Sequence, residues 1–123
     1  MKRVFTVSPK ISSFSFGESA LQSGVSATVT CSVSQGDLPL RFSWLHNNDK
    51  IGERDDITIF PFKRSSMLTI DSVSGSHAGN YTCVAENAAG VEYFTAPLIV
   101  NGWFSPQVPV TALAATVISF YKP

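Results

Sequence analysis

The feature that most constrains this chain is the spacing of four residues, which are its only two cysteines, a tryptophan and a tyrosine. Trp44 lies between Cys31 and Cys83, and Tyr81 stands two residues before the second cysteine. Around each of them apolar residues alternate with polar ones, which is the period of a half-buried β-strand. The chain is therefore expected to place its two cysteines on strands that are distant in sequence.

The alternation is clearest in residues 25–33. One face of this segment is apolar, with Val25, Ala27, Val29, Cys31 and Val33 expected to point inward. The other expected strands lie at 9–16, 41–46, 57–59, 68–70, 81–85 and 94–100. Turn residues separate them and no helical period occurs, so the pattern predicts an all-β sandwich of two antiparallel sheets.

The order and spacing of the four residues resemble the immunoglobulin fold. In that fold one disulfide joins the two sheets, a tryptophan packs on the sulfurs, and a tyrosine pins the corner before the second cysteine. The resemblance implies a Cys31–Cys83 disulfide and a core that contains Trp44, Tyr81 and Leu68. In the chain-entropy model such a bond stabilises the fold by roughly 4 kcal/mol. Two buried free thiols, as in intracellular muscle-type immunoglobulin domains, are the alternative.

A more specific resemblance begins at Leu68 and ends at Gly90. This run resembles the I-set immunoglobulin signature, and the resemblance extends over residues 9–101. Within that class the sequence is similar to repeats of the Dscam (Down syndrome cell adhesion molecule) family. The segments that carry this likeness are 9–11, 30–33, 36–39, 42–44 and 77–83. His77 departs from the general pattern, because most immunoglobulin domains carry Asp there. The ion pair that this Asp usually makes is therefore not expected.

The Dscam resemblance implies recognition at the cell surface. Members of the Dscam family act in neuronal self-recognition, axon guidance or immune recognition, through homophilic contact between like domains. Two alternatives remain at this point. One is an intracellular structural domain of a muscle or cytoskeletal scaffold, and the other is a secreted immune receptor that binds a foreign ligand.

Composition and motifs exclude several other functions. The net charge is zero and only 15% of residues are charged, so no basic field would attract nucleic acid. No catalytic or phosphate-binding motif occurs, and His46 and His77 are far apart and expected to face solvent, so we expect no enzyme, metal or cofactor. Two cysteines at this spacing favour an oxidising, extracellular or cell-surface location, although residues 1–7 contain no signal-peptide core.

The expected domain organisation is an N-terminal extension, 1–8, an immunoglobulin domain, 9–101, and a tail, 102–123. The apolar run 108–121 in the tail is shorter than the ~20 residues of a membrane span, so the domain itself is not expected to insert into a membrane. The tail is expected to be irregular. It is interpreted either as the beginning of an anchor or partner-binding segment or as a flexible or non-native end.

A candidate binding surface follows from the strand alternation. The outward positions of three expected strands carry no charge, and they are Thr28, Thr30, Thr58, Phe60, Met67 and Thr69. A glycosylation sequon, Asn80-Tyr81-Thr82, falls on the opposite sheet. A glycan at Asn80 would crowd that sheet, so we expect the uncharged face to contact another copy of the same domain.

Overall fold

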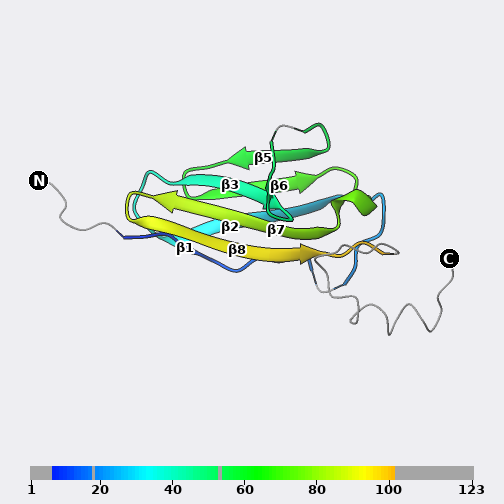
Figure 1. Ribbon diagram of the computed structural model, residues 1–123, viewed down its shortest axis with the longest axis horizontal. Coiled ribbons are helices and arrows are strands. Elements are labelled where there is room, and N and C mark those ends of the chain that lie inside the picture. The colour runs from blue at the N-terminus through cyan, green and yellow to red at the C-terminus, as the bar shows by residue number, and fades with distance from the viewer. Residues whose placement is uncertain (1–6, 18, 53, 102–123) are drawn as a thin grey trace, which may run out of the picture.

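Two four-stranded antiparallel sheets form the computed structural model, which describes residues 7–17, 19–52 and 54–101 (Figure 1). One sheet has the order β1-β2-β6-β5 and the other the order β4-β3-β7-β8. The strands are β1 (Lys10–Ile11), β2 (Ala27–Gln35), β3 (Arg41–His46), β4 (Asp49–Lys50), β5 (Ile57–Pro61), β6 (Ser65–Ile70), β7 (Gly79–Asn87) and β8 (Gly90–Leu98). A short 3-10 helix, η1 (Gly75–His77), precedes β7. The all-β sandwich predicted from the sequence is confirmed.

A disulfide joins the two sheets through the core. Cys31 on β2 and Cys83 on β7 are bonded at an S–S distance of 2.06 Å, and both are fully buried. Trp44 lies opposite Cys83 in the register of β3 and β7. Its indole N–H donates to the Ser66 hydroxyl of the other sheet over 3.0 Å, so the ring is buried without leaving a polar atom unpaired. The predicted disulfide is therefore confirmed.

Tyr81 fixes the turn that leads into β7. Its hydroxyl donates to the backbone carbonyl of His77 over 2.7 Å, and its ring is fully buried. The His46 ring stacks on it at 4.5 Å and Phe16 meets it edge-on at 5.3 Å. Burial raises the pKa of the Tyr81 phenol, so the hydroxyl remains a hydrogen-bond donor. Leu68 on β6 is also fully buried.

The prediction that Val25 points inward was wrong. Val25 is 40% exposed and precedes β2, which begins at Ala27. Its N–H donates to the Gln22 carbonyl at 3.4 Å, while its own carbonyl accepts the Val73 N–H at 2.8 Å. The backbone of Val25 thus belongs to a turn, where side-chain alternation no longer applies.

The first strand is shorter than predicted, and one short strand was not predicted. β1 ends at Ile11, whereas Phe14 and Phe16 pack on the core from irregular chain. The Phe14 ring lies 5.7 Å from Trp44, so its burial does not require a strand. β4, at Asp49–Lys50, occupies a stretch predicted as a turn, where two residues pair with the end of β3.

Replacing both cysteines by alanine should lower the free energy of unfolding by about 2–5 kcal/mol, because the unfolded chain then loses its cross-link. Urea unfolding monitored by tryptophan fluorescence measures the loss. Wild-type protein in reductant is the matched control and should unfold at nearly the same urea concentration as the variant. An unchanged midpoint in the variant would contradict the assigned role of the bond.

Candidate interaction surface

The six residues predicted to form a binding surface lie together on the outward face of β2, β6 and β5. Strand pairing arranges them in two cross-strand rows. The rows are Thr28–Thr69–Thr58 and Thr30–Met67–Phe60. We call these six residues the threonine face. Because each row crosses three neighbouring strands, the face is continuous.

The threonine face combines hydroxyl groups with two large apolar side chains. The Thr28 and Thr69 hydroxyl oxygens are 3.0 Å apart and hydrogen-bonded. Phe60 is 43% exposed and Met67 is half-buried. Neither row contains an ionisable side chain, so this surface presents no charge to a partner.

Phe62 extends this surface and was missed by the sequence reasoning. It is 58% exposed and lies just beyond β5, where its N–H donates to the Ser65 carbonyl over 2.9 Å. The expected strand ended before Phe62, so this residue was not considered for the surface. The two-residue spacing of Phe60 and Phe62 was the sequence signal that could have identified it.

The opposite face, on β3, β7 and β8, also carries apolar side chains but includes charges. Val91 and Tyr93 on β8 are 48% and 62% exposed. Arg41 and Glu86 form an exposed ion pair at 3.4 Å on the same sheet. Exposed aromatic residues are therefore found on both faces, and the absence of charge distinguishes the threonine face.

The sequon residues lie on β7, within this opposite sheet. Asn80 is half-buried, and its backbone N–H donates to the Asn47 side-chain oxygen over 2.8 Å. The Thr82 hydroxyl is hydrogen-bonded to that of Thr95 at 2.7 Å. Since Tyr81 points into the core, Asn80 lies on the outer face of β7. Its glycosylation stays a prediction.

His77 does not face solvent, and this prediction was wrong. The side chain is 3% exposed at the corner before β7. Its Nδ1 accepts the Ser74 backbone N–H over 2.9 Å, and its Nε2 lies 2.8 Å from a carboxylate oxygen of Asp56. Because a nitrogen that accepts a hydrogen bond carries no proton, this network assigns the proton to Nε2, which donates to Asp56.

Asp56 thus supplies the carboxylate that the sequence reasoning considered missing from this corner. Arg54 binds it through two hydrogen bonds of 2.9 and 2.7 Å. The hydrogen bonds from Arg54 are the main cause that holds the pKa of Asp56 well below its usual range, and the hydrogen bond from His77 is the second. Most immunoglobulin domains have the acid at the position of His77 and its basic partner near the position of Asp56. Here the acid is Asp56 and the partner at the corner is His77, so the two positions are still joined by a hydrogen bond.

His46 was likewise predicted to face solvent but is half-buried. Its Nε2 lies 3.0 Å from the Ala78 carbonyl, which can only accept a hydrogen bond, so the ring donates to it. Stacking on Tyr81 covers one face of the ring. Both histidines therefore serve the corner before β7.

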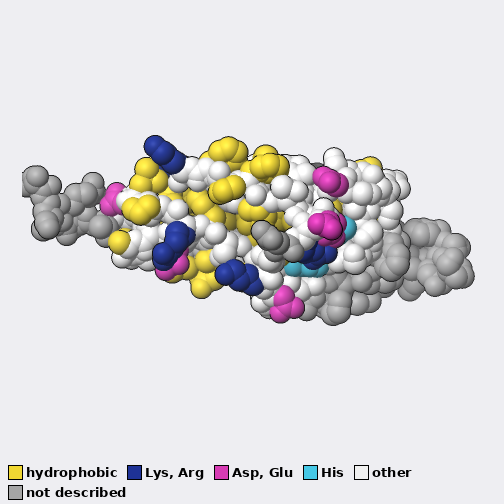
Figure 2. Space-filling model, turned by 90° about the horizontal axis from the view of Figure 1, so that it is seen from above, with side chains coloured by type: hydrophobic (Ala, Val, Ile, Leu, Met, Phe, Trp, Pro, Cys, Tyr) yellow, Lys and Arg dark blue, Asp and Glu magenta, His cyan; other side chains and the backbone are white. Residues whose placement is uncertain are grey.

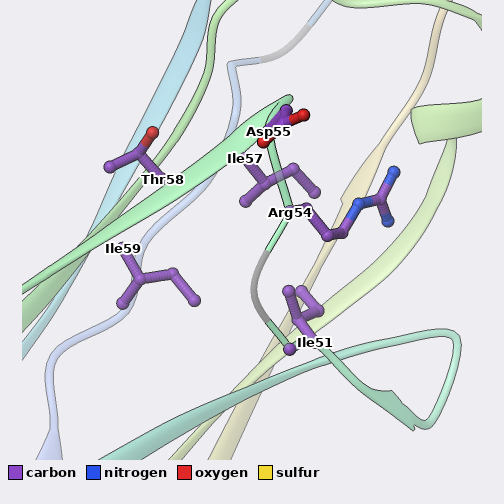
Figure 3. A pocket seen from close by; sticks show the side chains of 7 residues that line it. Ile51, Arg54, Asp55, Ile57, Thr58 and Ile59 are labelled. Carbon is purple, nitrogen blue, oxygen red and sulfur yellow. The ribbon is translucent and has the colours of Figure 1, made fainter.

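A hollow of about 750 Å³ opens beside β5, between this strand and the connection from β4 (Figure 3). Ile51, Ile57 and Ile59 form its apolar side, and Arg54 and Asp55 border it. Among the described residues no group of three His, Cys, Asp or Glu side chains is placed to hold a metal ion. Over the same part of the chain, no helix has the length and apolarity to cross a membrane.

Comparison with known proteins agrees with the geometry. The family model of the immunoglobulin domain matches residues 8–87. The cell adhesion molecule Dscam1 of Drosophila melanogaster is 43% identical over 97 residues, which is 77% of this chain. That match covers 5% of Dscam1, so the chain spans about one twentieth of the length of this relative.

Solved structures include neighbours of two kinds. The Dscam1 Ig7 domain, isoform 5, superposes with a TM-score of 0.74 at 38% identity, over 76% of this chain and 97% of that one. The I67–I69 fragment of titin superposes with a TM-score of 0.70 at 28% identity, over 76% of this chain and 32% of the fragment. Domains of Dscam1 and titin thus share this sandwich.

Asp56→Asn should lower the free energy of unfolding at pH 7 by about 1 kcal/mol, since Asp56 is partly exposed and its pairs are screened by solvent. A carboxyl with a lowered pKa stabilises the fold above its ordinary pKa of about 4 and loses this effect as the pH falls further. Urea unfolding at pH 7, 5 and 3 should therefore show the same difference between variant and wild type at pH 7 and 5, and a smaller difference at pH 3. Asp49→Asn, on exposed β4, is the control and should change stability little at any pH.

Proposed function

The chain belongs to the immunoglobulin domain family as a Dscam-like repeat, and from this premise we propose that it is a cell-surface recognition module that binds another copy of itself. The observation that carries the proposal is the uncharged threonine face. In a two-fold contact, a residue on the axis meets the same residue of the second copy, so charges there would repel one another. The threonine face has none.

The chemistry of the threonine face suits a protein partner. Threonine has restricted side-chain torsions, so ordering it on binding costs little conformational entropy. Met67 on β6 and Phe60 on the edge strand β5 add apolar area, and exposed apolar side chains of this kind commonly anchor interfaces. The face therefore offers two anchors within a stiff polar frame.

An extracellular location is part of the proposal. Disulfides persist in oxidising compartments, and Cys31–Cys83 is buried at the centre of the sandwich. Glycosylation of Asn80 would crowd the sheet that contains Arg41 and Tyr93. The threonine face would then be the more accessible of the two. We also infer that residues 9–101 form the domain, with 102–123 as a tail outside the described residues.

The likeness to titin supports a second candidate, an intracellular structural domain. Such a domain would keep its cysteines as thiols, so thiol titration without reductant on protein from its natural source separates the two. The third candidate, a secreted immune receptor for a foreign ligand, would use the same face. It would differ by failing to bind its own copy.

Thr30→Asp and Met67→Glu should each abolish aggregation of cells that display the domain, because each places like charges at the centre of the contact. Aggregate size measured by microscopy is the readout, with surface expression checked by antibody. Leu45→Glu, on the opposite sheet, is the control and should aggregate as wild type does. Loss with Leu45→Glu alone would move the contact to the opposite sheet.

Asn80→Gln should remove one N-linked glycan from protein secreted by eukaryotic cells, seen as a faster-migrating band on a denaturing gel. Asn101→Gln is the matched control and should leave migration unchanged, because Asn101 is outside any sequon. Wild-type protein that is insensitive to glycosidase would show that Asn80 is not modified.

A further inference from the structure

Asn101 lies where the chain leaves the sandwich. β8 ends at Leu98, at the right of Figure 1, and a parallel bridge between Leu21 and Val100 follows it. On the face seen in Figure 2 the hydrophobic side chains gather toward the opposite end, so this end of that face is largely polar. Val100 is buried, whereas Asn101 is exposed. The Asn101 side chain is therefore open to water.

Two hydrogen bonds hold the backbone as far as Asn101. The Leu21 N–H donates to the Ile99 carbonyl at 2.8 Å, and the Asn101 N–H donates to the Leu21 carbonyl at 2.8 Å. These bonds attach the end of the domain to the segment before β2. Both of them precede the Asn101 side chain and carbonyl, so a chemical change at those groups leaves both bonds in place.

Gly102 follows Asn101 in the sequence. The side-chain amide of an asparagine can be attacked by the backbone nitrogen of the next residue, and a side chain on that residue hinders the approach. Glycine has no side chain, and its backbone reaches the conformations that the attack requires. The reaction needs nothing from Gly102 beyond its residue type.

We propose that Asn101 is a site of spontaneous deamidation. The Gly102 nitrogen bonds to Cγ of Asn101 while the bond from Cγ to Nδ2 breaks, and ammonia leaves with the proton of the glycine nitrogen. The product is a cyclic imide, in which this nitrogen is bonded to two carbonyl carbons. Water then opens one of these two bonds. Opening at Cγ gives aspartate, and opening at the backbone carbonyl gives isoaspartate.

The other asparagines are held by their surroundings. Both polar atoms of the Asn87 side chain are hydrogen-bonded, the nitrogen to two backbone carbonyls and the oxygen to two backbone N–H groups. The Asn47 side-chain oxygen accepts the Asn80 N–H over 2.8 Å. Asn48 and Asn80 are each followed by a residue that is paired within a sheet, which restricts the attacking backbone. None of these asparagines precedes a glycine.

Deamidation at Asn101 changes the connection that follows the sandwich. Both products replace a neutral amide by a carboxylate, so a chain whose formal net charge is zero becomes more acidic. Isoaspartate also adds a methylene group to the backbone before Gly102, which alters the direction in which the following chain leaves. Because the hydrogen bonds with Leu21 precede this point, the sandwich itself should keep its stability.

Incubation of the purified full chain at 37 °C and pH 8 tests the proposal. Isoelectric focusing should show a more acidic band that grows with time, and peptide mass mapping should place the change at Asn101. Conversion there should be about tenfold faster than at Asn48 or Asn87, which are the internal controls. The rate should fall at pH 6, because the attacking nitrogen must lose its proton. Converted protein should unfold at the same urea concentration as fresh protein.

Asn101→Gln and Gly102→Val are the matched variants. The first lengthens the side chain, so ring closure is slower, and the second crowds the attacking nitrogen with a β-branched side chain. Both should lose the acidic band and unfold at the wild-type urea concentration. The proposal is overturned if wild-type Asn101 keeps its amide, if another asparagine reacts first, or if Gly102→Val converts as fast as wild type. A lower urea midpoint of converted protein would overturn the claim that the change stays outside the sandwich.

Discussion

The bond between Cys31 and Cys83 is the constraint on which the rest of this structure depends. It joins β2 of one sheet to β7 of the other, and Trp44 on β3 lies directly opposite Cys83. The hydrogen bond from the indole to Ser66 ties the same point to β6. Since these contacts fix the distance between the sheets, they also determine which residues of β2, β5 and β6 point outward. The residues of the threonine face therefore point outward because their neighbours on the same strands are packed in the core.

The sequence predicted this arrangement because strand alternation links position to orientation. Once Cys31, Trp44 and Cys83 are inward, Thr30 and its neighbours must be outward, and no knowledge of distant contacts is needed. Where the chain leaves a ladder, the rule fails. Val25 is exposed because its backbone bonds within a turn, and β4 forms because the end of β3 offers a partner for two residues.

Hydrogen-bonded pairs between residues of different loops could not be predicted from the sequence, for another reason. The partner of His77 is Asp56, which lies on a connection whose path depends on the whole fold. Because the family pattern has Asp at this position, His77 predicted that the usual ion pair is absent. In the structure the carboxylate comes from Asp56, so the corner still has a hydrogen bond to a carboxylate. The place of β5 at the end of its sheet was hidden similarly, because strand order cannot be read from alternation.

The disulfide has a consequence for a domain under tension. Pulling on the two ends of an intact domain can extend only the chain outside the loop between Cys31 and Cys83, which has a sequence separation of 52. Roughly half of the described chain therefore stays cross-linked even after the sheets separate. A tether built from such domains would therefore lengthen roughly half as much under load as one whose domains lack this bond, because only the segments outside the loop contribute to its extension.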